Sequence, residues 1–190
     1  MSNHVIGAGL FEMTLDDGRL PVQVQVSRNL WSRLEPSEVS AAAMTGYWVA
    51  ALYHDAPITR TGNYTALTAR LPRRAELITL LNARSLAEYE ALERVLYWHE
   101  EFTAHGPVTD FGFPSMSVTA GLGRISAITI DPRWAARTEP SYIGYDIIAC
   151  ANRIRQWRPK VPDEGSWAHR TDDELAQEVR EYYASLTRNR

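Results

Sequence analysis

The stretch that decides the fold is GLGRISAITIDPRWAARTEPSYIGYDIIACAN, residues 121–152. In its first half, Ile128 and Ile130 share one face at a period of two, which is typical of a β-strand, and Asp131-Pro132 ends the run. In its second half the apolar residues recur at steps of three and four, the period of an α-helix: Ile143, Ile147, Ala151 and then Ile154. The stretch therefore predicts a strand that leads into an amphipathic helix.

The same order of features occurs near the N-terminus. Gly18-Arg19-Leu20 precedes an alternating run and then Glu35-Pro36-Ser37, as Gly123-Arg124-Ile125 precedes one and then Glu139-Pro140-Ser141. From glycine to glutamate the step is seventeen residues in the first copy and sixteen in the second, and each connection contains a tryptophan, Trp31 or Trp134. We interpret this parallel as an internal duplication.

The first copy predicts a β-hairpin over residues 9–26. Its apolar residues alternate on both sides of Asp17-Gly18, a favoured pair for a tight turn, and Pro21 suits a strand start or an edge. Glu35-Pro36-Ser37 then opens a helix, which we expect to end near His54-Asp55, before Pro57. One face of this helix consists of Val39, Ala43, Tyr47 and Ala50.

The middle of the chain predicts a short strand over residues 64–68, a solvated basic cluster (Arg70, Arg73 and Arg74) and a long helix. Ser85 and Glu88 form a capping box at the start of that helix. Its apolar stripe runs through Leu86, Tyr89, Leu92, Leu96 and Phe102, and Gly106-Pro107 ends it. Met116, Val118 and Ala120 then alternate as a strand that pairs with residues 125–130. A third strand would come from residues 108–113 or from the first repeat.

The C-terminal segment predicts a linker followed by one more helix. Pro159, Pro162 and Gly165 interrupt any regular period, and Thr171 with Glu174 forms a second capping box. An apolar stripe follows at helical spacing: Leu175, Val179, Tyr182 and Leu186. This stripe must be buried either on the body of the protein or on a partner protein. The four residues are therefore the candidates for partner binding.

Three motifs in order resemble the YbaB/EbfC family of nucleoid-associated proteins over about residues 85–157. They are Gly121-Leu122-Gly123-Arg124-Ile125, Ile128-Thr129-Ile130-Asp131-Pro132 and Ile147-Ile148-Ala149-Cys150-Ala151-Asn152. The resemblance implies a helix, a short antiparallel sheet and a second helix. It also implies two functions, DNA binding or, as in YbaB-like accessory proteins of type VII secretion, binding of a protein partner. In the first repeat, Trp48 falls where the second has Asn152, and the C-terminal helix has no counterpart in the family pattern.

We therefore expect an α+β protein made of two YbaB-like hairpin-plus-helix repeats, with a long central helix and an added C-terminal helix. The expected divisions are residues 1–74, residues 75–160, and residues 161–190. The first repeat can stand in for the second subunit of a family dimer. The chain is then a monomer that acts as a pseudo-dimer, or it is a homodimer.

Composition limits the classes of function. The 190 residues carry a formal net charge of −3, which argues against a polycation that coats nucleic acid but leaves a local basic patch open. No apolar run has the length of a membrane span, and the N-terminal segment lacks the pattern of a secretory signal, so we expect a cytoplasmic protein. The single cysteine, Cys150, lies in an apolar helical run, where we expect it to be buried.

No pattern in the sequence indicates catalysis, a cofactor or a metal site. His99 and His105 are six residues apart, which places them on different faces if both are helical. Gly121 and Gly123 precede a strand instead of a helix and have no third glycine, so they do not form a phosphate loop. We expect a protein that is not an enzyme.

The basic cluster at the end of the second repeat is the candidate nucleic-acid site. It consists of Arg153, Arg155, Arg158 and Lys160, with Trp157 between them. Cations at this position also stabilise the C-terminus of a helix, and that is the competing interpretation. The preferred function is nucleoid-associated-like DNA binding, and the alternative is a type VII secretion accessory or chaperone-like role with a protein partner.

Overall fold

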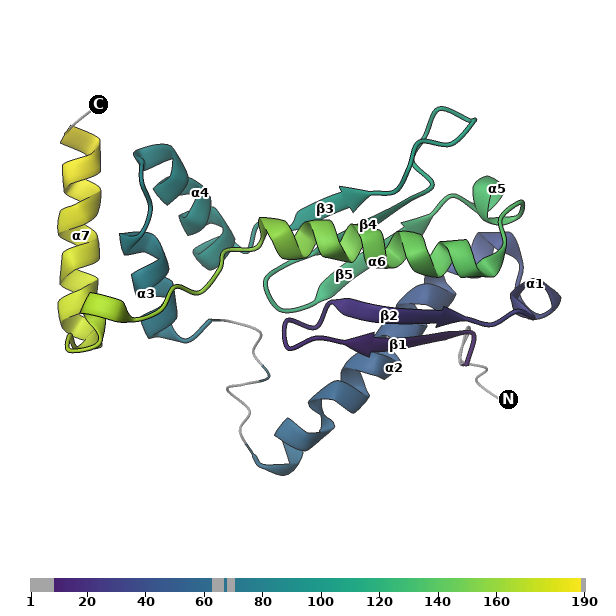
Figure 1. Ribbon diagram of the computed structural model, residues 1–190, viewed down its shortest axis with the longest axis horizontal. Helices are drawn as coiled ribbons and strands as arrows, with labels where there is room; N and C mark the ends of the chain where they lie inside the picture. Colours follow the sequence, from purple (N-terminus) through teal and green to yellow (C-terminus); the bar gives the residue numbers. More distant parts are fainter. Residues whose placement is uncertain (1–8, 63–66, 68–70, 189–190) are drawn as a thin grey trace. The chain divides into compact units, whose positions relative to one another are not determined.

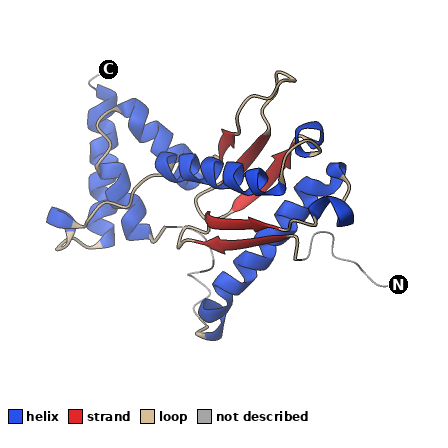
Figure 2. Ribbon diagram, turned by 45° about the vertical axis from the view of Figure 1, so that its right-hand side comes forward, coloured by secondary structure: helices blue, strands red, loops and turns tan. Residues whose placement is uncertain are grey.

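The computed structural model describes residues 9–62, 67 and 71–188, and it is a mixed α+β protein with two small antiparallel sheets (Figures 1 and 2). Its contacts divide the chain into two compact units. Unit 1 comprises Met1–Ala69 and Phe102–Trp157, and unit 2 comprises Arg70–Glu101 and Arg158–Arg190. The hairpin-plus-helix parts of both predicted repeats, residues 9–54 and 114–157, belong to unit 1, whereas residues 75–101 of the predicted second repeat belong to unit 2. Most of the strand predicted over residues 64–68 lies outside the described residues, as does Arg70.

The first sheet of unit 1 is the predicted hairpin. β1 (Phe11–Leu15) pairs antiparallel with β2 (Pro21–Val26), and Pro21 is the first residue of its strand. The turn differs from the expected tight Asp17-Gly18 pair. Asp16 accepts a hydrogen bond from the N–H of Leu20 at 2.8 Å, and the left-handed residue is Arg19, with φ of 55°. Arg19 is held there by an ion pair with Asp55 at 2.8 Å.

The second sheet has the order β3-β4-β5. β4 (Met116–Ala120) and β5 (Ile125–Ile130) confirm the two predicted strands. The third strand was predicted wrongly, because it is β3 (Phe102–His105) and not residues 108–113 or part of the first hairpin. Phe102 is therefore in a strand instead of a helix. The helical path has ended before it, since His99 has a positive φ of 54°.

Two long helices cover the strands of unit 1. α2 (Val39–Arg60) packs on β1 and β5, and it passes behind the β1–β2 hairpin in both views (Figures 1 and 2). α6 (Pro140–Trp157) packs on β2, β3 and β4. Short helices lie in the described connections of unit 1, namely α1 (Leu30–Arg33), η1 (Pro36–Glu38) and α5 (Pro132–Ala135).

The residues predicted to form the apolar faces of α2 and α6 are the residues that these helices bury. Val39, Ala43, Tyr47 and Ala50 of α2 are buried, and so are Ile143, Ile147, Ala151 and Ile154 of α6. The predicted end of α2 was wrong, because the helix continues past Pro57 to Arg60. Pro57 is exposed, so water can satisfy the carbonyl that loses its helical donor. The hydroxyl of Thr59 donates to the carbonyl of Asp55 at 3.0 Å in the same turn.

The described residues of unit 2 form the helices α3 (Arg73–Leu81), α4 (Leu86–Tyr97) and α7 (Asp172–Arg188), with the short η3 (Gly165–Trp167) before the last. Ser85 caps α4, as predicted, by accepting from the N–H of Glu88. α7 packs on α3 and α4, and its Leu175 is fully buried. α4 is the helix that we expected to precede the sheet of the second repeat. It packs against α3 and α7 within unit 2.

In the described part of the chain, none of the helices has the length and apolar character that crossing a membrane requires.

Candidate functional site

The predicted basic cluster is divided between the two units. Arg153 and Arg155 lie on α6 in unit 1, whereas Arg158 and Lys160 belong to unit 2. Arg155 has a structural role, because its Nε donates to Oδ2 of Asp16 at 2.7 Å and its Nη2 donates to the carbonyl of Pro21 at 3.3 Å. These bonds hold the turn of the first hairpin against α6. A DNA site at the four residues stays a prediction.

Arg153 lies beside the one cysteine. Its Nη2 is 3.7 Å from the sulfur of Cys150, which is fully buried, as the sequence predicts. Burial raises the pKa of this thiol, although Arg153 opposes the shift, so the reactive thiolate is disfavoured. One turn earlier, Asp146 accepts a hydrogen bond from the hydroxyl of Ser115 at 3.1 Å, and burial raises the pKa of this carboxyl group. This hydrogen bond joins α6 to the residue that immediately precedes β4.

The predicted partner-binding stripe of α7 is covered within unit 2. Leu175 is fully buried and Val179 is buried, whereas Leu186 is half-buried. The hydroxyl of Tyr182 donates to the carbonyl of Ala83, and the rings of Tyr89 and Tyr183 lie 5.1 Å apart. This packing supports the first of the two interpretations, in which the stripe docks on its own body.

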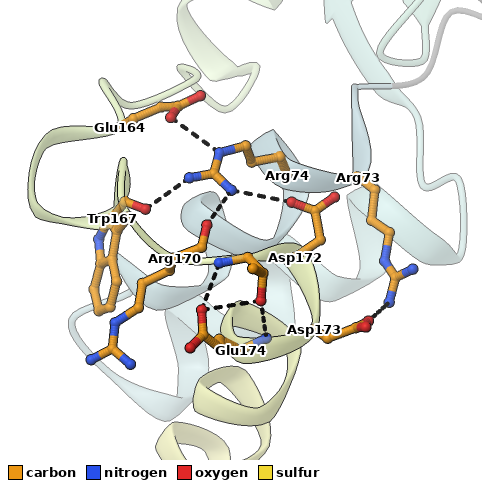
Figure 3. A network of polar contacts seen from close by, with 9 residues as sticks. Arg73, Arg74, Glu164, Trp167, Arg170, Asp172, Asp173 and Glu174 are labelled. Atoms are coloured by element: carbon orange, nitrogen blue, oxygen red, sulfur yellow. Dashed lines mark hydrogen bonds and ion pairs between the residues drawn. The ribbon is translucent and has the colours of Figure 1, made fainter.

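Arg74 organises the chain that precedes α7 (Figure 3). Its guanidinium pairs with Glu164 at 3.1 Å and with Asp172 at 3.2 Å. It also donates to the carbonyls of Trp167 at 2.7 Å and Arg170 at 2.8 Å. Arg74 was predicted to lie in a solvated basic cluster, but its side chain is only 23% exposed. Its partners are 90 or more residues away in sequence, so no local pattern could reveal this role.

α2 has a second apolar face, which is exposed and which the sequence pattern did not single out. Trp48, Val49, Leu52 and Tyr53 are 46%, 44%, 71% and 75% exposed. Their spacing of one, four and five residues places them on one face of the helix, opposite the buried face. We call these four residues the α2 stripe.

No charged residue interrupts the α2 stripe. Its neighbours on the same face, one turn before and after, are Thr45 and Ala56. The charged residues of α2 are Asp55, which pairs with Arg19, and Arg60 in the last turn. The sequence signal was available, because α2 carries apolar residues all round, as buried helices do.

A hollow lies along each side of the α2 stripe. The first, of about 400 Å³, is lined by Trp48 and Leu52 together with Arg19, Asp55 and Arg124. The second, of about 310 Å³, is lined by Val49 and Tyr53 together with Phe11, Glu12 and Met13 of the β1 side. The stripe is therefore a ridge between two depressions. This shape suits another chain that has both a ridge and a groove.

Other polar groups in unit 1 serve local structure. Asp131 caps α5 and receives hydrogen bonds from the guanidinium and the backbone N–H of Arg133, each at 2.8 Å. The side-chain bonds from Arg133 lower the pKa of Asp131 to about 2. Arg133 also lies over the ring of Phe111, at 4.9 Å from its centroid. Across the residues that the structure describes, no group of three or more His, Cys, Asp or Glu is arranged to hold a metal ion.

No family model, no curated protein and no solved structure matches this chain.

Proposed function

We propose that this chain is a non-enzymatic binding protein whose ligand is another protein, and that the ligand binds at the α2 stripe. The observation that carries the proposal is the exposure of Trp48, Val49, Leu52 and Tyr53 on one uncharged helix face. Exposed apolar patches of this kind mark protein-interaction sites, and Trp and Tyr are the residues that most often contribute binding energy there.

Electrostatics favours a protein ligand over DNA. A phosphate backbone is recognised by Lys and Arg, but the α2 stripe itself has no charged side chain. In the predicted DNA cluster, Arg155 is already engaged by Asp16. Protein binding is also the second of the two functions that the YbaB resemblance implies, in the accessory or chaperone-like role of type VII secretion.

The internal duplication belongs to the same proposal. Each predicted repeat contains a hairpin followed by a long helix, β1–β2 with α2 and β4–β5 with α6. The packing is partly reciprocal. α2 contacts β1 of its own hairpin and β5 of the other, and α6 contacts β4 of its own hairpin and β2 of the other. α6 also contacts β3, which has no counterpart among the described residues of the first repeat. An experimental structure in which residues 9–54 and 114–157 fail to superpose about a pseudo-two-fold axis would remove the duplication and leave the α2 stripe untouched.

The test is site-specific photo-crosslinking in cells. A photoreactive amino acid replaces Tyr53 in the stripe or, as the matched control, Tyr145 of α6, which is 66% exposed. We expect a crosslinked protein adduct from position 53, none of the same mass from position 145, and loss of the adduct when Leu52→Glu is added. The absence of an adduct at position 53, or an adduct that contains nucleic acid, would contradict the proposal.

A further inference from the structure

We infer that the protein which covers the α2 stripe is a second copy of this chain, so that two copies associate through their α2 helices. This inference rests on the proposed function and names its partner. In a two-fold dimer the same patch occurs on both sides of the interface, so the patch must be complementary to itself.

The α2 stripe meets the chemical requirement for self-association. A patch with a single sign of charge repels its own copy, but this stripe has no charge from Thr45 to Tyr53. Its side chains are aromatic or aliphatic, and their polar atoms are the indole N–H of Trp48 and the hydroxyl of Tyr53, which usually find a hydrogen-bond partner in an interface. Charged groups line the hollows beside the stripe: Arg19, Asp55 and Arg124 in one, with Arg19 and Asp55 paired to each other, and Glu12 in the other. Such a distribution, with an apolar centre and a polar rim, is typical of specific interfaces.

The shape of the stripe also suits a second copy. Each molecule has a ridge, formed by the four side chains, and a hollow on either side of it. When two identical helices cross, the ridge of each can occupy a hollow of the other, which is how helices pack in protein interiors. A flat or featureless partner would leave both hollows empty.

The area is sufficient for a reversible dimer. From their exposed fractions, the four side chains leave on the order of 500 Å² of surface in water in each copy. Complete burial of the stripe in both copies would remove roughly 1,000 Å² from water, which is about the lower bound for a specific interface. The walls of the hollows add to this area. We therefore expect a dimer that dissociates on dilution, not a permanent one.

The experiment combines mass measurement with cysteine crosslinking on the purified full chain. Sedimentation equilibrium over a range from micromolar to hundreds of micromolar should show a monomer–dimer equilibrium for the wild type. Leu52→Glu should raise the dissociation constant of the dimer at least tenfold, whereas Tyr145→Glu should leave this constant unchanged. Circular dichroism verifies that each variant is folded, as the exposure of both side chains leads us to expect.

Crosslinking identifies the surface that associates. Leu52→Cys should form a disulfide-linked dimer on mild oxidation, and Tyr145→Cys should not; the native Cys150 is buried and does not compete. A wild type that stays monomeric at hundreds of micromolar, or a dimer that persists in Leu52→Glu, would overturn the inference. The proposed function is tested separately, and it fails when position 53 yields no protein adduct in cells. If position 53 yields an adduct with a different protein, and the purified wild type is monomeric, only the inference of a dimer is overturned.

Discussion

The hydroxyl of Tyr47 accepts a hydrogen bond from the backbone N–H of Ile125 at 2.8 Å and donates one to the carbonyl of Arg19 at 3.2 Å. One buried side chain of α2 thus joins the turn of the first hairpin to the start of β5. The inner face of α2 is fixed to both sheets by this residue. The opposite face, with the α2 stripe, is consequently held in one orientation and remains open.

Tyr47→Phe keeps the ring and removes the hydroxyl. Because the N–H of Ile125 and the carbonyl of Arg19 then lose this partner in a buried site, we expect the free energy of unfolding to fall by about 1–3 kcal/mol. Urea denaturation measures the change. Tyr53→Phe is the matched control in the same helix, because the ring of Tyr53 is 75% exposed, and it should change stability by less than about 0.5 kcal/mol.

Gly46 allows α2 to approach β1. A Cβ atom at this position would lie 2.5 Å from Cβ and 2.6 Å from the carbonyl oxygen of Phe11, so Gly46→Ala requires the backbone to move. We expect a loss of about 1–3 kcal/mol in thermal or chemical unfolding, in spite of the better helix propensity of alanine. Gly144→Ala meets the carbonyl of Val24 at 3.0 Å and should cost less. Gly121→Ala, with no atom within 4 Å of its Cβ, is the control and should be nearly neutral.

Asp131 should make the stability of unit 1 fall as the pH is lowered into the acid range. Its pKa is about 2 in the folded protein, below the ordinary value for an aspartate, because Arg133 stabilises the carboxylate. The stabilisation is therefore fully present above the unfolded pKa and disappears as the pH falls toward 2. We expect Asp131→Asn to melt below the wild type at pH 7 and to converge with it near pH 2. A difference in melting temperature that is the same at both pH values would contradict this account.

Asp146 should behave in the opposite way. Burial raises the pKa of its carboxyl group, although Ser115 and Arg153 oppose the shift, so ionisation is less favourable in the folded than in the unfolded chain. Its contribution is present at low pH and is lost as the pH rises through the folded pKa. The wild type should therefore lose stability relative to Asp146→Asn between acid and neutral pH. The two melting curves, measured across that range, check the sign.

A duplex DNA binding assay distinguishes the proposed protein binding from the DNA binding that the sequence favours. With micromolar protein at low salt, we expect no shift of duplex DNA in an electrophoretic assay. A shift that weakens steeply with salt, and whose salt dependence is reduced by Arg153→Ala with Lys160→Ala, would favour DNA binding instead. Arg155 should be left intact in this assay, because its replacement breaks the bond to Asp16 and would disturb the first hairpin.

Local sequence patterns predicted the helices and strands of this fold better than they predicted which of these elements pack together. Period-two runs gave both hairpins, and the three- and four-residue steps gave the buried faces of α2 and α6. The strand at Phe102 was missed because Phe102 was assigned to the apolar stripe of the preceding helix, although it follows Leu96 by six residues and would lie about 120° from it on a helix. The packing of α7 on α3, and the role of Arg74 in it, depends on contacts across more than ninety residues. Such contacts leave no local periodicity.

The candidate site was missed for a different reason. The helical period over residues 39–54 defines one apolar face, with Val39, Ala43, Tyr47 and Ala50, and does not specify what covers the opposite face. Trp48, Leu52 and Tyr53 were visible there, but periodicity alone does not distinguish a helix buried on both sides from one with an open face. The structure makes this distinction, because it shows which face the strands cover.

The measurement that tests the central claim most directly is hydroxyl-radical footprinting of two tyrosines. Tyr53 and Tyr145 are 75% and 66% exposed in the chain by itself, so both should be labelled at similar rates in a dilute solution of Leu52→Glu. In the wild type, in cells or at high concentration, Tyr53 should become protected while Tyr145 is labelled as before. Equal labelling of the two tyrosines under every condition would contradict the claim that the α2 stripe is an interface.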